Sequence, residues 1–382
     1  MNRPILIPGL PRFWRGPREI QFGSDPSRAL SIELPDPRAA QILDLLDGTR
    51  PERAVLLRAA ELGAPVDQAK ALLEALQAAG LVLPAADLLP TAVPDEPRRR
   101  LIGEAAALAM TGRHPADILR RRSNCRVILT GPGRLGAPIG VALTEAGVGS
   151  VQADVPGTVG PGELAGGPLH GTDLGRPRRE AISDAVLRAA SGSCPPSVRR
   201  ITAPRSRPPS VRDPADRPPS AQDNAMPRLH PAFPPATDGT GPHPPPEFDP
   251  AMSLVVRLDQ DGPPGVPHLA VTIRDGTPVI GPFVPAFGGP CLRCLDLHRQ
   301  DRDPAWPSPP RRPLHEAIQP CAVATLLAAT AFATAEALTH LDGGRPQTVG
   351  ATVEITAPGR TRRRRWTPHP ACHCTADPPA RH

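Results

Sequence analysis

A glycine-rich turn between a strand and a helix constrains the fold of this chain more than any other stretch. The apolar run 127–129 predicts a buried strand, and glycines follow it at the spacing G-x-G-x-x-G: Gly131, Gly133 and Gly136. Apolar residues then recur at helical spacing as far as Ala146, and a second short apolar run ends at Asp154. This order of strand, turn, helix, strand and acid predicts an α/β domain with a Rossmann-like nucleotide-binding unit.

Each glycine of this unit has a physical role. The first permits the tight turn, the second lets the backbone approach a phosphate, and the third lets the helix pack closely on the strand. The N–H groups of the first helical turn attract an anion, and Asp154 follows the second strand where an acid would hold a ribose hydroxyl. The motif does not separate a dinucleotide from ATP, and a tight turn in an unliganded α/β domain is the alternative.

The composition of the 382-residue chain narrows the class of protein. The formal net charge is +6, and nearly all of the positive charge is carried by arginine, because Lys70 is the only lysine. Arginine clusters at 98–100, 120–122 and 362–365 have no interleaved aromatic residues, so we interpret them as solvated faces or anion contacts. We therefore expect no nucleic-acid partner.

The sequence shows no sign of a membrane segment. No apolar run reaches the ~18 residues that a membrane-spanning helix needs. The N-terminal stretch MNRPILIPGLPRFW lacks the apolar region of a signal peptide. We therefore expect a cytoplasmic protein with no membrane contact.

Residues 1–90 are predicted to form a separate small module. Extended segments are expected at 4–10, 19–22 and 30–34, and helices at 37–46, 52–62 and 66–79. Thr49 is the expected cap of the second helix. Strands followed by three short helices resemble a winged-helix arrangement, and the acids in the last helices argue against DNA binding.

A proline-containing linker is expected at 85–96, and a helix follows it. The helix is expected at 98–110 and leads into the nucleotide-binding half of the central domain, which covers 97–194. This half ends with a helix at 173–190, with Pro177 in its first turn.

Residues 195–250 interrupt the regular pattern. They are rich in proline and poor in apolar side chains, so burial cannot offset the entropy of ordering them, and we predict a disordered insertion. The second half of the domain then covers 251–375. Its strands are expected at 253–258, 268–273 and 279–284, its long helix at 318–341, and a terminal hairpin at 348–355 and 362–366.

Four of the seven cysteines form two close pairs, C-x-x-C and C-x-C: Cys291 with Cys294, and Cys372 with Cys374. Two such pairs suit a tetrahedral structural zinc ion, which has no open position for a catalytic water. His369 or His373 could replace one thiolate. A redox role for the first pair is the alternative, but it leaves the second pair unexplained. Cys125 and Cys321 are expected in or near the core.

The order of these motifs resembles the ThiF/MoeB/HesA superfamily of ubiquitin-activating-type adenylyltransferases. The resemblance is carried by GPGRLG, EAGVGSV, the acid at the next strand end, DLGRPRREA and the two cysteine pairs. GGPCLRCLDLHRQDRDPAWP and RRRRWTPHPACHC look especially like actinobacterial ThiF-family proteins and cyclodehydratase components of azole-forming peptide biosynthesis. The resemblance covers residues 100–375 outside the insertion. Residues 1–90 look similar to the winged-helix module with which such relatives bind the leader of a precursor peptide.

The resemblance implies adenylation of a C-terminal carboxylate by ATP and Mg²⁺, with release of pyrophosphate. It implies that Asp154 holds the ribose and that the turn contacts the phosphates through Gly131, Gly133, Arg134 and Gly136. Arg178 stands where the family has a phosphate-binding lysine, and Asp259 is the nearest match to its magnesium-binding aspartate. The family's Asp-Asn pair and the arginine after its Ser-Asn-Leu segment are absent, which bears on catalysis more than on the fold.

Three functions follow from these observations. The first is an enzyme that adenylates the C-terminal carboxylate of a small carrier protein or peptide. The second is a catalytically degenerate scaffold that binds a precursor peptide for a partner cyclodehydratase such as a YcaO-like enzyme. The third is an NAD-dependent oxidoreductase, for which the cysteine pairs have no role. Relatives are commonly homodimers, so the resemblance also implies a homodimer.

Overall fold

The computed structural model describes residues 2–34, 36, 39–91, 95–191, 253–258, 266–286, 288–306 and 319–375. The predicted disordered insertion lies outside these residues, and so do Asp259 and Cys194. All the described elements belong to one compact unit, Met1–Cys194 together with Asp249–His382. None of the helices in this described part is long and apolar enough to cross a membrane.

The N-terminal module combines three helices with two small antiparallel sheets. Strands β1 (Pro4–Leu6) and β5 (Val82–Pro84) form one sheet, and the other has β2 (Arg12–Trp14), β3 (Glu19–Phe22) and β4 (Leu30–Glu33) in that order. The helices are α1 (Ala40–Leu43), α2 (Glu52–Glu61) and α3 (Val66–Ala78). Buried apolar side chains of both layers form a core of their own. The predicted combination of short strands with three helices is confirmed.

Two details of this module differ from the prediction. The first helix is only four residues long, because the N–H groups of Asp44, Leu45 and Leu46 bond to the carbonyls three residues back instead of four. Thr49 does not cap α2, since its N–H and hydroxyl donate to Asp47 Oδ1 at 2.8 and 2.5 Å. Pro51 takes the cap position instead and makes no side-chain cap hydrogen bond.

Short helices follow the module. Strand β5 leads into α4 (Ala85–Leu88), so the predicted linker at 85–96 is helical at its start. Helix α5 (Asp95–Met110) matches the next predicted helix, and α6 (Pro115–Ser123), which the sequence did not indicate, packs against it. Their apolar faces share a small core.

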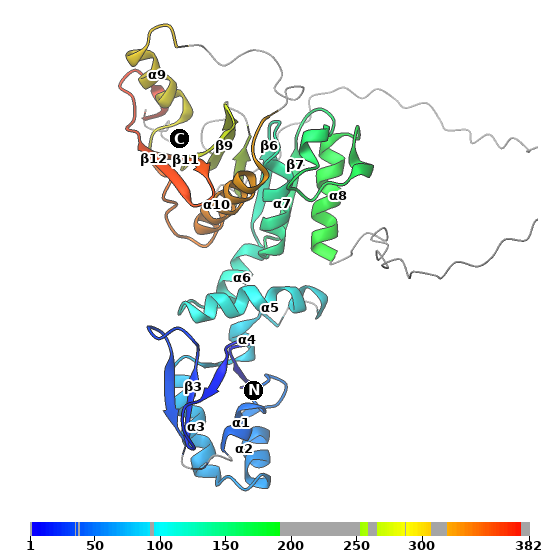
Figure 1. Cartoon of the computed structure of the whole chain (residues 1–382), viewed down its shortest axis with the longest axis vertical. Helices are drawn as coiled ribbons and strands as arrows, with labels where there is room; N and C mark the ends of the chain where they lie inside the picture. Colours follow the sequence, from blue (N-terminus) through cyan, green and yellow to red (C-terminus); the bar gives the residue numbers. More distant parts are fainter. Residues whose placement is uncertain are drawn as a thin grey trace, which may run out of the picture. The chain divides into compact units, whose positions relative to one another are not determined.

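A seven-stranded mixed sheet, in the order β12-β11-β10-β9-β8-β6-β7, organises the rest of the described chain (Figure 1). Its strands are β6 (Arg126–Thr130), β7 (Ser150–Asp154), β8 (Ser253–Arg257), β9 (His268–Arg274), β10 (Thr277–Val284), β11 (Ala351–Ala357) and β12 (Arg360–Arg365). Strands β7, β6, β8 and β9 are parallel, and β10, β11 and β12 continue the sheet antiparallel. The predicted strands and the terminal hairpin are confirmed, with shifted ends.

Three helices pack on one face of this sheet. Helices α7 (Gly136–Glu145), α8 (Arg178–Ser191) and α10 (Val323–Leu341) bury apolar residues in one core with strand residues such as Leu129 and Val271. This core carries the strand, turn, helix and strand unit that the glycine spacing predicts. The predicted Rossmann-like α/β fold is therefore confirmed.

Two of these helices begin later than predicted. A 3₁₀ turn, Gly171–Asp173, precedes α8, and Pro177 is bridged to Thr158 before the helix starts. Helix α10 begins at Val323 rather than at 318.

Helix α9 (Leu292–Arg302) packs on the opposite face of the sheet. Leu269 and Val271 of β9 belong to the core with α10. Because side chains alternate along a strand, Ala270 and Thr272 face the other side, where they line a cavity with residues of α9.

A buried ion pair joins α6 to the end of α10. Arg122 donates to both carboxylate oxygens of Asp342, at 2.7 and 2.9 Å, and to Glu104 Oε1 at 2.6 Å. The side chains of Arg122 and Asp342 are 3% and 2% exposed, so neither charge is solvated by bulk water. Removing Arg122 would leave the buried Asp342 carboxylate with only the more exposed Arg113, whose Nη2 lies 3.0 Å from Asp342 Oδ2, as an ion-pair partner.

We predict that Arg122→Met lowers the free energy of unfolding by about 3 kcal/mol, because it removes the only buried partner of the Asp342 carboxylate among the described residues and leaves it the more exposed Arg113. Urea denaturation followed by circular dichroism measures this change. Arg120→Met is the matched control, because the Arg120–Asp117 pair is exposed, and it should change stability by less than about 1 kcal/mol. Equal effects of the two substitutions would contradict the assignment.

Candidate functional site

The candidate nucleotide site lies where the parallel strands end. Thr130, the last residue of β6, is in register with Asp154 of β7 on one side and with Arg257 of β8 on the other. The chain passes from β6 to β7 and later returns to β8 on the other side of β6. Such a reversal of strand order leaves a crevice at the carboxyl ends of the strands, where open α/β sheets bind ligands.

The glycine turn has the backbone geometry that its spacing predicts. Gly131 and Gly133 have φ angles of +82° and +153°, which L side chains rarely adopt. Gly136 opens α7, and a Cβ there would lie 2.7 Å from Leu258 Cδ1. The turn and the close helix packing are therefore confirmed, whereas contact with a phosphate stays a prediction.

One N–H group of the turn already has a partner within the chain. Gln319 Oε1 accepts a hydrogen bond from the backbone N–H of Arg134 at 3.1 Å. A Cβ on Gly133 would lie 3.3 Å from the same oxygen, so the carboxamide lies directly against the turn. The Gln319 oxygen thus occupies a position that a phosphate oxygen would also favour. No sequence signal pointed to Gln319.

The side chain of Arg134 holds neighbouring segments together. Its Nη1 donates to the carbonyls of Gln319 and Cys321 at 3.0 and 3.1 Å, and its Nη2 donates to the carbonyl of Ala165 at 3.3 Å. These bonds tie the glycine turn to the segment before α10 and to the loop after β7. The structure therefore gives Arg134 an organising role, and direct contact with a cofactor stays a prediction.

Arg178 lies in a different environment from the one that a phosphate contact would require. Its guanidinium forms a bidentate pair with Glu163, with both N···O distances 2.8 Å, and also donates to the carbonyls of Pro156 and Thr158. Only 3% of Arg178 is exposed. These contacts close the loop between β7 and α8, so any contact with phosphate would need them to rearrange.

The accessible arginine at this edge is Arg179. It pairs with the exposed Asp154 carboxylate, with an N···O distance of 2.5 Å, and about two-thirds of each side chain is exposed. The segment DLGRPRREA contains both Arg178 and Arg179, but the position of the family's lysine pointed to Arg178. The ribose contact of Asp154 stays a prediction, and Asp259 lies outside the described residues.

The four paired cysteines come together as the sequence predicts. The Sγ atoms of Cys291 and Cys294 are 3.8 Å apart, those of Cys291 and Cys372 3.6 Å, and those of Cys294 and Cys374 3.3 Å. Tetrahedral zinc with bonds of about 2.3 Å places its sulfur ligands about 3.8 Å apart. The donor set and its spacing fit a structural zinc ion, and the redox alternative is not favoured because the second pair completes the cluster.

The cluster consists of the four cysteines, and neither His369 nor His373, the proposed substitutes for a thiolate, belongs to it. His369 Nε2 is 2.8 Å from Asp301 Oδ2, and its Nδ1 accepts from the N–H of Ala371 at 3.1 Å. The carbonyl of His369 accepts from the N–H of Cys372, so the residue shapes the loop that carries the second cysteine pair. Cys125 is buried in the main core, as expected, and Cys321 packs against it.

Protonation of the cysteine cluster is coupled to metal binding. Burial raises the pKa of the Cys291 thiol. Burial also acts on Cys372, but hydrogen bonds from the Cys374 backbone and from Cys294 outweigh it and lower the Cys372 pKa. Because zinc binds thiolates, zinc loading must release protons and is favoured as pH rises.

No protein-family model matches the sequence, and a search of curated proteins found no match either. Solved structures share the fold at low sequence identity. E. coli MccB with MccA has a TM-score of 0.52 at 14% identity over 99% of this chain and 100% of that chain. E. coli MccB with ATP has 0.52 at 13% over 97% and 99%. The heterocyclase TruD has 0.50 at 12% over 98% of this chain and 43% of that chain.

We predict about one zinc ion per purified chain, and its loss in Cys294→Ser, because the buried Cys294 sulfur contacts two of the other three. Elemental analysis by mass spectrometry measures the metal content. Cys321→Ser is the matched control, since this cysteine lies outside the cluster, and it should keep the zinc. A folded wild-type protein that stays zinc-free in zinc-containing buffer would contradict the prediction.

Proposed function

We propose that this protein is an ATP-dependent adenylyltransferase that activates the C-terminal carboxylate of a peptide or small carrier protein. The observation that supports this most is the glycine turn after β6, with Asp154 at the end of the adjacent parallel strand. A shared fold with MccB, which has been solved with ATP and with MccA, is consistent with a nucleotide and a peptide.

The residues of the turn would position the nucleotide. Gly131 and Gly133 adopt positive φ angles and have no Cβ. Phosphate oxygens can therefore approach the N–H groups at the start of α7. Asp154 would accept from the ribose, and Arg179 beside it would add positive charge. Bound ATP with Mg²⁺ would supply the adenylyl group for the substrate carboxylate, with pyrophosphate as the leaving group. The chain contributes orientation and electrostatic stabilisation.

The cysteine cluster has a structural role in this proposal. A zinc ion held by the four sulfurs would join the start of α9 to the end of the described chain. Four thiolates leave no open coordination position, so the chemistry would not pass through this metal. Asp259 remains the proposed magnesium ligand from the resemblance alone.

The N-terminal module is the proposed binding site for a peptide leader. Strand β2 lies at the edge of its sheet, and its Phe13 and Trp14 side chains are exposed. An edge strand offers unpaired backbone groups to an extended peptide, and exposed aromatic side chains offer apolar contacts. A YcaO-like partner enzyme and a homodimer are proposals from the resemblance alone.

A catalytically degenerate scaffold is the second candidate, and two specific contacts favour it. The Arg178 guanidinium is already paired with Glu163, and Gln319 Oε1 already accepts from an N–H of the glycine turn. If these contacts persist, nucleotide binding is weakened and the module would present a peptide to a partner. An NAD-dependent oxidoreductase is the third candidate, and no observation specifically favours it.

We predict saturable binding of ATP with Mg²⁺ by isothermal titration, and at least about tenfold weaker binding by Gly133→Val. Valine would strain a backbone with a φ of +153° and would press on Gln319. Gly171→Val is the matched control, because Gly171 has no neighbouring atom within 4 Å of a Cβ and no positive φ.

Exchange of pyrophosphate into ATP, with a candidate precursor peptide present, separates the remaining functions. Binding with peptide-dependent exchange supports the adenylyltransferase, whereas ATP binding without exchange supports the scaffold. Failure of the zinc-loaded wild type to bind ATP would contradict the nucleotide site. Binding of NAD instead of ATP would favour the oxidoreductase.

A further inference from the structure

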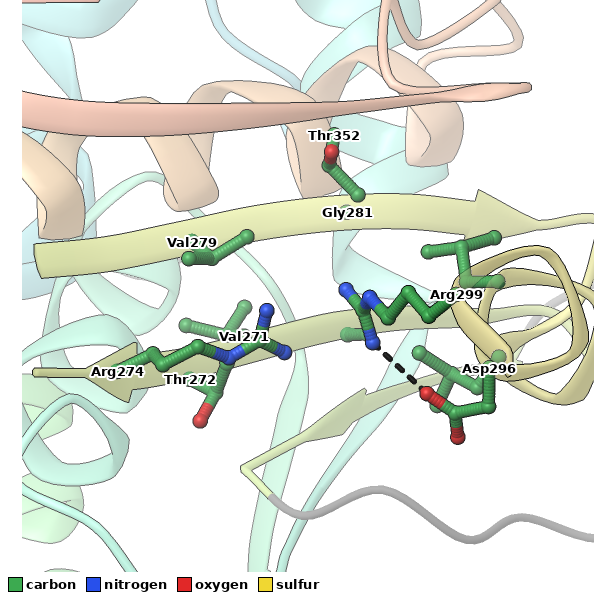
Figure 2. Close-up of a pocket in the computed structure, with 11 residues that line it drawn as sticks. Val271, Thr272, Arg274, Val279, Gly281, Asp296, Arg299 and Thr352 are labelled. Atoms are coloured by element: carbon green, nitrogen blue, oxygen red, sulfur yellow. Dashed lines mark hydrogen bonds and ion pairs between the residues drawn. The ribbon is translucent and has the colours of Figure 1, made fainter. Parts of the chain in front are cut away.

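A small cavity lies between the sheet and α9, on the face opposite α10 (Figure 2). It measures about 20 Å³ and is lined by residues of β9, β10, β11 and α9. Apolar side chains such as Leu295 and Val279 form part of the wall, and two guanidinium groups, those of Arg274 and Arg299, form another part. The nucleotide and cysteine sites do not use this cavity.

Arg274 forms no ion pair with any of the residues that the structure describes. Figure 2 shows the side chains of Arg274 and Arg299 extending toward each other from β9 and α9. Within the described residues, the half-buried Arg274 guanidinium makes no hydrogen bond and no ion pair. Burial and the charge of Arg299 lower the pKa of Arg274, and the carboxylates of Asp296, Glu354 and Asp275 offset this only in part. A half-buried cation that faces a like charge favours the binding of an anion.

Two of these acids are engaged by other arginines. Asp296 Oδ1 accepts from Arg299 Nη1 at 2.8 Å. Glu354 lies 3.2 Å from Arg364 Nε and 3.9 Å from Arg362 Nη1. Of the three acids, the adjacent Asp275 has no arginine partner among the described contacts, but its carboxylate makes no ion pair with Arg274 either.

The wall of the cavity that α9 forms is held in position by contacts of Arg299 with two tryptophan rings. The Arg299 guanidinium lies over the rings of Trp306 and Trp366, at 5.7 and 5.6 Å from their centroids. Trp366 Nε1 donates to Thr352 Oγ1 at 3.0 Å, which ties this ring to β11 beside the cavity. The two guanidinium groups together present preorganised donors to an anionic acceptor.

We propose that Arg274 and Arg299 bind a side-chain carboxylate of an acidic peptide segment at the mouth of this cavity. The enclosed space holds about one water molecule, so it admits the end of a side chain rather than a whole small molecule. A planar carboxylate with two oxygens matches the fork of a guanidinium. The carboxylate site does not depend on the proposed adenylyltransferase function, but its assignment to the peptide substrate rests on it.

The position of the cavity suits a substrate contact. Arg274 ends β9, which is parallel to β8 and β6, so it lies toward the same edge of the sheet as the glycine turn. A Cβ on Gly276, in the turn after β9, would lie 3.7 Å from the carbonyl of Pro320. The adjacent Gln319 contacts the glycine turn. A peptide anchored at Arg274 would therefore lie close to the candidate nucleotide site.

Thermal unfolding of the full-length, zinc-loaded protein with a hexaglutamate peptide, capped at both ends, tests this site. We expect a saturable rise of the melting temperature in the wild type and a binding at least about tenfold weaker in Arg274→Met and Arg299→Met. Arg360→Met is the matched control, because it removes one exposed arginine charge from the neighbouring β12 and should keep the full response. Capped hexaglutamine should give no shift.

Several results would overturn the site. One is an equal shift in wild type and Arg274→Met, and another is the same shift from sodium chloride or phosphate at matched ionic strength. A fall of more than about 4 °C in the unliganded Arg274→Met protein would show a structural role instead. Hexaglutamine with a free C-terminus distinguishes a terminal carboxylate from a side chain, and a shift from it alone overturns the side-chain assignment.

Titration with ATP separates this inference from the proposed function. ATP binding without a hexaglutamate response would reject the carboxylate site and leave the adenylyltransferase proposal standing. A hexaglutamate response that depends on Arg274, in a protein that binds no ATP, would keep the site and reject its assignment to an adenylated substrate.

Discussion

The close approach of α7 to the sheet is the constraint on which the nucleotide-binding half depends. A Cβ at Gly136 would lie 2.7 Å from Leu258 Cδ1, and a Cβ at Gly140 would lie 2.8 Å from Leu129 Cδ1. Both distances are shorter than carbon atoms can pack, so a side chain at either position would have to displace a buried leucine or the helix itself. The packing fixes where α7 begins. It therefore aims the first-turn N–H groups at the edge where β6 and β7 end.

The features that sequence predicted well are local ones. Glycine spacing, helical periodicity and the acid at the strand end lie within 30 residues and specify the β6, α7 and β7 unit. The cysteine cluster was predictable although its pairs lie far apart, because two close pairs, C-x-x-C and C-x-C, have the spacing of a metal site. The ends of the helices were predicted less accurately. Helix α8, for example, begins only after Pro177, which forms a β-bridge with Thr158.

The features that sequence missed depend on contacts between distant segments. Arg134 bonds to Gln319 and Cys321, more than 180 positions along the chain, and no spacing rule indicates such a pairing. Arg178 matched a family motif, yet folding of the loop after β7 brings Glu163 to it and buries both. The Arg274 and Arg299 pair likewise exists only because α9 packs on the outer face of the sheet. The sequence shows which side chains are charged, but it does not show which of them pair with one another in the fold.

Hydrogen–deuterium exchange of the intact protein, with and without ATP and Mg²⁺, tests most directly whether the glycine turn is the nucleotide site. We expect slower exchange in segments 130–137 and 319–322, because bound phosphate would order the turn and the segment that now contacts it. Exchange in α3 of the N-terminal module should not change. Protection confined to other segments, or no change at a saturating ATP concentration, would contradict a nucleotide site at this turn.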